Sequence, residues 1–527
     1  MGDGQQARAL MRPPPIRHRP SPVPVQSIRA SKRVRAPAGL RQRVPAATFR
    51  RAFVSRLSLV ALSVVILLAD GVRPDTLAAA MHSGTLPALT ALRDEGALHI
   101  VTSCFPSVTG PAYAPFLMGR FPGPIGLPGL RWFDRARTAC TFPDYSRSYV
   151  GYQMGAVDRD IAADAPTIFE LTDGLGALSV IGRGLPVARR VGRVTLPRAI
   201  RAARTHFTGN VRGWLDIDRD IADMLVDQVR RDRPEFVFGA FAGVDKTSHA
   251  AGHASPMVIE ALRIVDDAAS TIRRDAERLG YWRGMSMWIV SDHGHSPVRG
   301  HEDLAGIITE HGLRTLAHPW VFTPAPDVAV MVSGNAMAHL YLELGQRTRP
   351  TWPSLASRWG DLLDMVLRRP SVDLAILPRS DGVEVRSASR GAALIRRMGA
   401  AFDYRMESGD PLGVGSDVIC VSADEAHAIT LDGDYPDGIV QIALLATAPR
   451  SGDIILSAAR DWDFRARYEP IPHVSSHGAL HREHMLVPLI VNQPVHSPPR
   501  RTVDVMPSAL AALGKAIPAG LDGTSFL

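Results

Sequence analysis

The feature that most constrains the fold is a series of short, almost uninterrupted apolar segments that alternate with longer amphipathic ones. The apolar segments are rich in β-branched and aromatic residues and lie at 62–69, 97–102, 177–181, 236–242, 286–291 and 486–492. Helical periodicity is found between them, at 86–95, 217–231 and 256–279. Strands that are apolar on both faces are typical of parallel sheets covered by helices on both sides. We therefore expect an α/β fold, a three-layer sandwich with a largely parallel central sheet flanked by helices.

The alternation changes between residues 318 and 450. Segments 327–344 and 372–389 have the composition of strands joined by tight turns, and helices are expected at 352–368 and 391–400. We interpret residues 318–450 as a smaller α+β insertion, or cap. The core that carries it would begin with residues 57–317 and be completed by residues 451–527.

Residues 1–56 are rich in proline and arginine and have no helical or strand periodicity, which indicates a disordered arm. They carry 13 Lys and Arg against one acid, a net charge of +12, so the rest of a chain with a total of +8 has −4. A solvated tail is the simplest interpretation. Contact of the arm with nucleic acid or an anionic membrane is the alternative. No feature of the sequence indicates a protein partner.

The apolar run from Leu57 to Ala69 follows the paired arginines at 50–51 and resembles a twin-arginine export signal. The run is too short to span a bilayer. It also leads directly into Asp70, and cleavage near Ala69 would remove the strand that positions this carboxylate. We favour a buried strand in a cytoplasmic protein, with export as the alternative.

Polar side chains stand next to several of the apolar runs. Asp70, Thr109, Asp245 and the Asp292–His293 pair each come shortly after a run, and His477 comes shortly before the last one. In parallel sheets, sites form beyond the carboxyl ends of the strands. We therefore expect these side chains to lie close together at one edge of the sheet.

The spacing of these residues is typical of metal ligands. Asp245 and His249 are four residues apart, which places them on one face of a helix. Asp292 and His293 can serve one ion if the chain turns after them, and Gly294 permits a turn. Carboxylates and imidazoles suit two divalent ions, Zn²⁺ in the first place with Mn²⁺ as the alternative. The three cysteines form no CxxC pair and indicate neither a disulfide framework nor a thiolate site: Cys104, Cys140 and Cys420.

Thr109 has a different role in this set. Two ions about 3.5–4 Å apart can hold the attacking and leaving oxygens of an in-line displacement. A threonine hydroxyl bound to one ion loses its proton easily and becomes a nucleophile. We interpret Thr109 as the nucleophile of a metal-dependent hydrolase.

Six ordered segments resemble the alkaline phosphatase superfamily, and within it the type I phosphodiesterase/nucleotide pyrophosphatase branch. They are "LLADGVRPD", "FPSVTGPAYAPFLMGRFPGPIG", "VDKTSHAAGH", "IVSDHGH", "SSHGALHREH" and "RTVDVMPSALAALGKAIPAGLDGTSF". The resemblance covers residues 60–310 and 470–527.

The resemblance implies a hydrolase of phosphoric esters whose small-molecule substrates are phosphodiesters or nucleotide pyrophosphates. It assigns one ion to Asp245, His249 and His477. The second ion would be held by Asp70, Asp292 and His293, with Thr109 as its nucleophilic ligand. The reaction would pass through a phosphothreonine, which a water activated at the first ion would hydrolyse.

Substrate contacts are less defined by the sequence. Family members that cleave nucleotide diesters carry an asparagine where Leu130 stands, and the neighbouring Arg131 is a candidate phosphate clamp or a partner of Asp134. Tyr113 and Trp132 could line a substrate pocket or belong to the core. Further histidines are candidates for supporting or substrate-proximal roles: His253, His295, His301, His473, His481 and His484.

Three alternatives stay open. A phosphomonoesterase would share the site, and a hydrolase of C–P bonds resembling phosphonoacetate hydrolase would also use a threonine. A non-enzymatic binding protein, tethered to a polyanion or membrane and holding a structural metal, is the alternative outside enzymes. Sulfatases are disfavoured because "FPSVTGP" lacks their C/S-x-P-x-R pattern.

Overall fold

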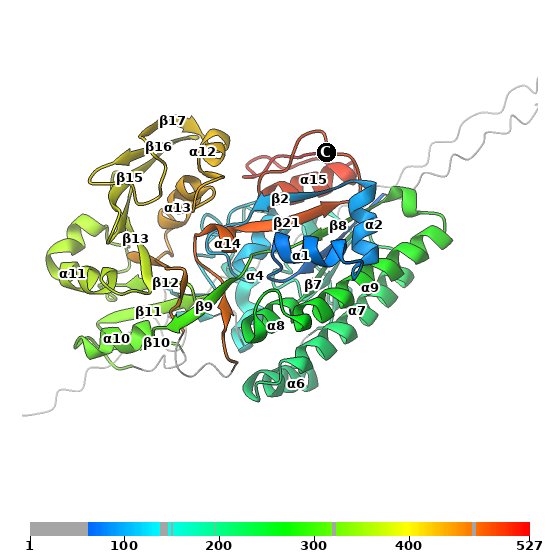
Figure 1. The fold of residues 1–527 in the computed structure, drawn as a ribbon, viewed down its shortest axis with the longest axis horizontal. Coiled ribbons are helices and arrows are strands. Elements are labelled where there is room, and N and C mark those ends of the chain that lie inside the picture. The colour runs from blue at the N-terminus through cyan, green and yellow to red at the C-terminus, as the bar shows by residue number, and fades with distance from the viewer. Residues whose placement is uncertain (1–61, 137–145, 149–150, 194, 319–322, 466–470) are drawn as a thin grey trace, which may run out of the picture. The chain divides into compact units, whose positions relative to one another are not determined.

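The computed structural model describes residues 62–136, 146–148, 151–193, 195–318, 323–465 and 471–527. The arm at 1–56 and Cys140 lie outside these ranges. Two large β-sheets and the helices packed on them make up most of the described chain (Figure 1).

The first sheet has seven strands in the order β2-β21-β8-β1-β7-β5-β6. Its strands are β1 (Ser63–Ala69), β2 (Ala97–Thr102), β5 (Gly174–Ala177), β6 (Arg190–Val191), β7 (Phe236–Phe241), β8 (Met285–Val290) and β21 (Leu486–Val491). β8, β1, β7, β5 and β6 run parallel to one another, whereas β21 is antiparallel to both β8 and β2. The expectation of a largely parallel sheet is therefore confirmed.

Helices cover this sheet on both faces. Successive residues of β1 belong to two different hydrophobic clusters, because Val64, Ile66 and Leu68 face one side and Val65 and Leu67 the other. One cluster includes residues of α3 (Ala114–Met118) and α15 (Val505–Ala512). The other includes residues of α1 (Pro74–His82), α2 (Pro87–Glu95), α7 (Arg212–Asp232) and α9 (Pro256–Arg278), which Figure 1 shows on one side of the sheet. The α/β fold class predicted from the apolar strands is thus confirmed.

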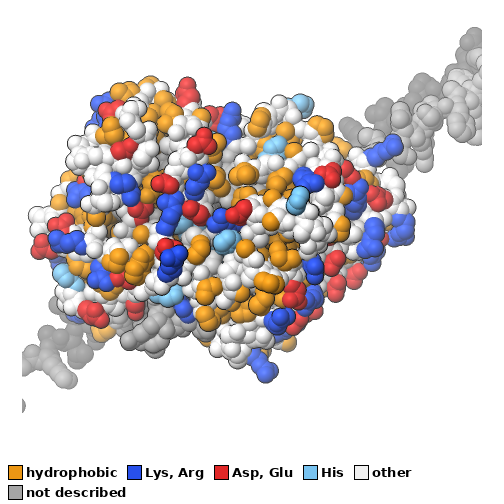
Figure 2. Space-filling view, in the orientation of Figure 1, with side chains coloured by type: hydrophobic (Ala, Val, Ile, Leu, Met, Phe, Trp, Pro, Cys, Tyr) orange, Lys and Arg blue, Asp and Glu red, His pale blue; other side chains and the backbone are white. Residues whose placement is uncertain are grey.

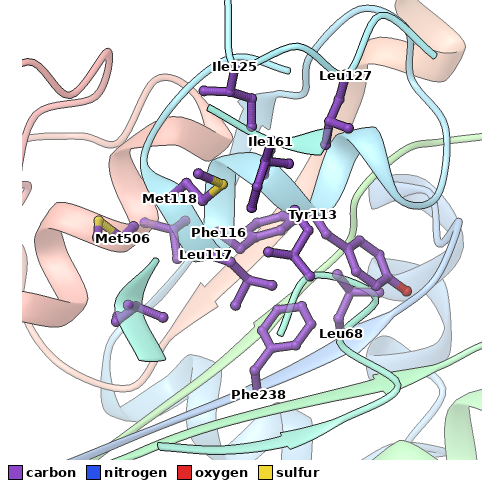
Figure 3. Close-up of a cluster of buried hydrophobic side chains, with 14 of the residues drawn as sticks. Leu68, Tyr113, Phe116, Leu117, Met118, Ile125, Leu127, Ile161, Phe238 and Met506 are labelled. Atoms are coloured by element: carbon purple, nitrogen blue, oxygen red, sulfur yellow. The ribbon is translucent and has the colours of Figure 1, made fainter. Parts of the chain in front are cut away.

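The segment after Thr109 is anchored in the first of these clusters. A short 3₁₀ turn at Pro111–Tyr113 leads into α3, which ends at Gly119 in the left-handed conformation with a φ of 59°. Figure 3 shows Phe116 and Leu117 packed towards Phe238 of β7, with the Tyr113 hydroxyl pointing away from the cluster. Fixed packing after the turn holds the backbone at Thr109 in place.

The second sheet has nine strands in the order β10-β11-β12-β18-β13-β14-β15-β16-β17. These are β10 (Thr315–Ala317), β11 (Val328–Ser333), β12 (Met337–Tyr341), β13 (Val372–Pro378), β14 (Val383–Ser387), β15 (Gly391–Met398), β16 (Ala401–Met406), β17 (Val418–Ser422) and β18 (Ile454–Ala458). Its helices are α11 (Trp352–Leu367), α12 (Ala423–Thr430) and α13 (Gly438–Ala446). Most of this sheet falls in the segment expected to form an insertion, whose exact boundaries stay a prediction.

Two local expectations are wrong. Residues 391–400 were expected to be helical from their Ala, Leu and Arg content, but residues 391–398 form β15, paired with β14 and β16. Cross-strand pairing here outweighs intrinsic propensity. The strand expected at 177–181 instead ends at Ala177, and the positive φ angles of Leu178 and Val180, 50° and 56°, turn the chain out of the sheet.

Smaller elements complete the described chain. The helices are α4 (Val157–Asp160), α5 (Ile168–Leu171), α6 (Leu196–Phe207), α8 (Gly243–Ala251), α10 (Leu304–Glu310) and α14 (Arg482–Met485). The strands are β3 (Arg131–Phe133), β4 (Ser146–Ser148), β9 (Ser296–His301), β19 (Asp461–Asp463) and β20 (Ser475–Ser476). Among the helices that the structure describes, none combines the length and the apolar character needed to cross a membrane.

Candidate active site

The candidate ligands lie where three neighbouring strands end. Asp70 follows β1, Asp292 stands just beyond β8, and Asp245 lies in the first turn of α8, which begins shortly after β7. β1 pairs in parallel with both β7 and β8, so the three strands end at the same edge of the sheet. The sheet topology therefore brings together three carboxylates that are far apart in the sequence.

Asp245 is the centre of a first group of donor atoms. Its Oδ1 lies 3.1 Å from His249 Nε2, 3.0 Å from His295 Nε2 and 3.4 Å from His477 Nε2. All four side chains are buried. In tetrahedral zinc sites with bonds of about 2.0–2.1 Å, the donor atoms lie about 3.3 Å from one another. The group thus has the spacing of a metal site, and it contains the three residues that the sequence assigns to the first ion.

The second group surrounds Thr109. Thr109 Oγ1 lies 3.2 Å from Asp70 Oδ1 and 3.2 Å from His293 Nε2. The same His293 nitrogen lies 3.2 Å from Asp70 Oδ1 and 3.5 Å from Asp292 Oδ2. One donor atom each of Asp245, Asp70 and His293 lie within 4.8 Å of one another, so the two groups are adjacent. The structure brings together all seven residues predicted as ligands.

The environment of Asp292 fits a bound cation. Its Oδ1 accepts a hydrogen bond of 3.2 Å from the Gly71 amide. Its Oδ2 is buried and has no hydrogen-bond partner among the described residues. A buried carboxylate oxygen without a partner is costly. A divalent ion between Asp292, Asp70 and His293 would be the partner that this oxygen requires.

The histidines are oriented as metal ligands usually are. His249 Nδ1 lies 2.8 Å from the Ser475 carbonyl oxygen, and His477 Nδ1 lies 3.0 Å from the Ser107 carbonyl oxygen. Each Nδ1–H can donate to its carbonyl, which leaves the lone pair of Nε2 directed at the carboxylates. This arrangement fixes the tautomer and the ring orientation of a ligand.

The pKa shifts reflect the close packing of acids. Burial and the neighbouring Asp70 charge raise the pKa of Asp292 well above its usual value. Burial opposes protonation of His293, but the carboxylates of Asp292 and Asp70 prevail and raise its pKa to about 9. Without a metal, the site therefore gathers a proton on His293 at neutral pH.

Three further side chains support Asp245. His295 Nε2 lies 3.0 Å from its Oδ1, and His295 Nδ1 lies 3.1 Å from Ser475 Oγ. Lys246 Nζ lies 2.8 Å from Asp245 Oδ2. Asp218 accepts a hydrogen bond of 2.6 Å from the Gly243 amide at the start of α8. The two oxygens of Asp245 therefore have different partners, histidines at Oδ1 and Lys246 at Oδ2, which fixes the rotation of the carboxylate.

Lys246 and Asp218 are not among the residues predicted from the sequence. A signal for Lys246 exists, because it is one of only three lysines in an arginine-rich chain and stands directly beside Asp245. Asp218 gives no such signal. In the sequence it looks like any other acid on a helix, and only the packing of α7 on α8 brings it to the start of α8.

Two glycines permit close approach at the site. Gly71 has a φ of +78°, and a Cβ there would lie 2.9 Å from the ring of His295. Gly294, which was expected to allow a turn, does not have a positive φ. A Cβ at Gly294 would lie 2.1 Å from the Glu483 carbonyl oxygen. Close packing of two backbones therefore requires a glycine at this position.

The candidate substrate residues lie in different surroundings. The buried Tyr113 hydroxyl donates to Asp70 Oδ2 over 3.3 Å, so this side chain borders the ligand set. Arg131 is partly exposed and donates from Nη1 to the Val332 carbonyl over 3.4 Å. Trp132 is fully buried in the core, with the Arg450 guanidinium 5.8 Å from its ring centroid. Of the two alternatives for Trp132, a substrate pocket or the core, its complete burial supports the core.

The remaining histidines mostly have structural partners. His473 stacks on His249 with ring centroids 4.1 Å apart, and His484 Nε2 lies 2.8 Å from Ser296 Oγ. His301 and His481 pair with acids, Asp463 at 2.7 Å and Glu483 at 2.9 Å. His253 is half-buried, and burial lowers its pKa. None of these five belongs to a group of metal donors among the described residues.

Solved structures of known proteins share this fold. Phosphonoacetate hydrolase from Sinorhizobium meliloti 1021 is similar in structure. Its complex with phosphonoformate has 15% identity and a TM-score of 0.51, and its complex with phosphonoacetate has 16% identity and a TM-score of 0.52. Each alignment covers 86% of this chain and 96% of the hydrolase chain. An inactive variant of murine ectonucleotide pyrophosphatase/phosphodiesterase 5 with AMP has 12% identity and a TM-score of 0.50, covering 87% of this chain and 96% of that one. At these identities the likeness establishes the fold. A search of curated protein sequences finds no match.

The family itself is established by the sequence model of type I phosphodiesterases/nucleotide pyrophosphatases, which matches residues 64–369. The match covers more than half of the chain and includes six of the seven ligand candidates; only His477 lies beyond it. The chain therefore belongs to the type I phosphodiesterase/nucleotide pyrophosphatase family, and it is a hydrolase of phosphoric esters.

Proposed function

We propose that this protein is a two-metal phosphohydrolase that cleaves phosphodiesters and nucleotide pyrophosphates through a covalent phosphothreonine on Thr109. The observation that carries the proposal is the position of Thr109 Oγ1, 3.2 Å from both Asp70 Oδ1 and His293 Nε2. A hydroxyl among metal-binding side chains is the arrangement expected of an activated nucleophile.

The residues divide into two ligand sets. Asp245, His249 and His477 would hold one ion, and Asp70, Asp292, His293 and Thr109 the other. Nitrogen and oxygen donors at this spacing suit Zn²⁺, with Mn²⁺ as the alternative. The ions, when bound, would lower the pKa of the threonine hydroxyl and of a water molecule and would stabilise charge on the phosphoryl oxygens.

The chain's own groups account for the course of the reaction. Thr109 Oγ, having lost its proton, attacks phosphorus and forms the new P–O bond. The bond to the leaving oxygen breaks, and that oxygen departs with the electron pair. Water then attacks the same phosphorus, the P–Oγ bond breaks, and a proton from that water restores the Thr109 hydroxyl as the phosphate monoester leaves. The hydrogen bond from Tyr113 to Asp70 would hold that carboxylate in place through both steps.

Arg131 is the candidate for binding the substrate phosphate. It is partly exposed at the start of β3, next to Leu130, whose amide donates to Ser333 Oγ over 3.0 Å. A guanidinium can bind two phosphoryl oxygens at once. It would replace the amide that related nucleotide hydrolases place at position 130.

The direct test compares three substrates with one metal-loaded preparation of known metal content. We expect a higher kcat/KM for bis-p-nitrophenyl phosphate than for p-nitrophenyl phosphate, and about two divalent ions per chain. A preference for the monoester would favour a phosphatase. Release of acetate from phosphonoacetate, the ligand of one structural neighbour, would favour C–P hydrolysis. No turnover of any of the three would contradict the proposal and favour a binding protein.

A further inference from the structure

The helix α6 (Leu196–Phe207) presents its apolar side chains to solvent. Leu196, Ile200 and Phe207 are 75%, 59% and 74% exposed, and Val187, which precedes the helix, is 61% exposed. These are the four highest exposures of large hydrophobic side chains in the described part of the chain. Three of them lie on one twelve-residue helix and form a patch rather than the scattered apolar residues that are usual on a surface.

The patch is a continuous stripe along the helix. Leu196, Ile200, Ala203 and Phe207 stand at positions i, i+4, i+7 and i+11, which is one face of an α-helix, and all four are exposed. A stripe with this spacing normally packs on the protein core. Here the twelve-residue helix has a single buried residue, Thr205.

The polar side of α6 makes the contact with the rest of the protein. Arg198 Nη2 lies 2.9 Å from the sulfur of Met224, and Arg201 forms an ion pair with Asp220; both partners belong to α7. In Figure 1, α6 lies beyond α7 and α8 at the periphery of the described structure. The helix is thus attached through arginines with its apolar side facing outwards.

The segment that carries the patch is strongly basic. Residues 187–207 contain six arginines and no Asp or Glu. Over the face drawn in Figure 2, by contrast, basic and acidic side chains are intermixed. Arg193 and Arg204 are exposed and form no ion pair with the described residues, so their charges are available to an anionic partner.

We propose that α6 docks on an anionic phospholipid surface. Leu196, Ile200 and Phe207 would enter the boundary between headgroups and acyl chains, and Arg193 and Arg204 would contact lipid phosphates. An apolar stripe flanked by arginines is the composition of helices that lie in the membrane interface. A second copy of the chain fits less well, because a symmetric contact would place two six-arginine segments against each other.

A fluorescent probe in the full chain tests insertion directly. Phe207→Trp, compared with the unchanged chain to remove the signal of the native tryptophans, is mixed with vesicles of phosphatidylcholine and phosphatidylglycerol. We expect a blue shift of the added tryptophan, quenching by brominated phosphatidylglycerol, and loss of both at high salt or with phosphatidylcholine alone. Absence of quenching with anionic vesicles would overturn the proposal.

Co-sedimentation with the same vesicles tests the stripe as a whole. The triple variant Leu196→Ser, Ile200→Ser and Phe207→Ser should bind at least about tenfold more weakly than the unchanged chain. The basic residues 1–56 are common to both proteins, so the difference in binding between the two reports the stripe. Equal binding of the two would contradict the role of α6.

Two controls separate docking from misfolding and from self-association. Ile419→Ser removes a side chain that is 58% exposed outside α6, and it should leave vesicle binding unchanged. Hydrolysis of a soluble diester should be the same in the triple variant, which shows that it is folded. A dimer in light scattering that the triple variant abolishes, without any vesicle binding by the unchanged chain, would overturn the lipid proposal in favour of a second copy.

Discussion

Thr109 Oγ1 lies 3.2 Å from Asp70 Oδ1, although the two residues are 39 positions apart in the sequence. Asp70 is held at the end of a central strand, and Thr109 is held by the buried segment that follows it. Neither side chain needs a large rearrangement to share one ion. The fold itself therefore positions the proposed nucleophile beside its proposed metal ligand.

Thr109→Ala should abolish turnover while leaving metal binding largely intact. The nucleophilic oxygen is lost, but Asp70, Asp292 and His293 still offer three donors to the second ion. We expect kcat to fall by about 10³-fold or more, measured with bis-p-nitrophenyl phosphate alongside elemental analysis. Thr109→Ser, which keeps a hydroxyl, should retain part of the activity. An unchanged rate in Thr109→Ala would refute the nucleophile assignment.

His477→Ala should weaken the first metal site selectively. Its Nε2 lies 3.4 Å from Asp245 Oδ1, whereas the second group retains all its donors. We expect the first ion to bind more than about 100-fold more weakly and the second ion to bind normally. Removal of a direct ligand should lower metal affinity at least as much as removal of a residue that is hydrogen-bonded to a ligand. Competition with a chromophoric chelator measures this. Two ions bound as tightly as in the unchanged protein would mean that the third ligand lies elsewhere.

His295 should act as a positioning residue for Asp245. His295→Ala removes the group 3.0 Å from Asp245 Oδ1 and should weaken metal binding by about 10–100-fold. His295→Gln places an amide N–H near the same point and should restore much of the affinity. His301→Ala, which removes a histidine paired with Asp463 at 2.7 Å, is the matched control and should bind metal normally. Equal losses in the Ala and Gln variants would contradict a positioning role.

Metal uptake should release a proton from His293. Its pKa of about 9 in the metal-free protein means that a proton occupies the ring below that pH. This proton competes with the metal ion for the ring. The affinity for metal should therefore rise with pH up to about 9, and above that pH deprotonation of His293 should add no further affinity. Calorimetry in buffers of different ionisation enthalpy measures the protons released. If metal binding released the same number of protons at pH 7 and at pH 10, this pKa would be contradicted.

Arg131→Ala should impair substrate binding without affecting the metals. A charge-assisted contact to phosphate contributes about 1.5–3 kcal/mol, so kcat/KM should fall by about 10–100-fold. Arg120→Ala, which removes an arginine paired with Asp522 at 3.3 Å, serves as the control for loss of an arginine near the same segment. If Arg131→Ala lowers only the melting temperature, the residue has a structural role.

The sequence predicts the central sheet well because its strands are apolar on both faces. β1, β7 and β8 fall within one or two residues of their expected bounds. The strand β15 is missed because its Ala, Leu and Arg residues favour a helix locally, and only pairing with β14 and β16 makes it a strand.

Some contacts of the site can be predicted from sequence spacing, whereas others arise only when distant segments come together in the fold. The spacing of Asp245 and His249 already indicates a shared ion, because both lie on one helix. The contact of His295 with Asp245 depends on the neighbouring positions of β7, β1 and β8, which no local pattern encodes. The burial of Trp132 is likewise a property of the packed core.

The stereochemical course at phosphorus tests the central proposal most directly. A diester substrate that is chiral at phosphorus is hydrolysed by the metal-loaded protein in isotopically labelled water, and the configuration of the product is determined. Each in-line displacement inverts phosphorus, so attack by Thr109 followed by attack of water predicts net retention. Net inversion would show a single displacement by water and would contradict a phosphothreonine intermediate.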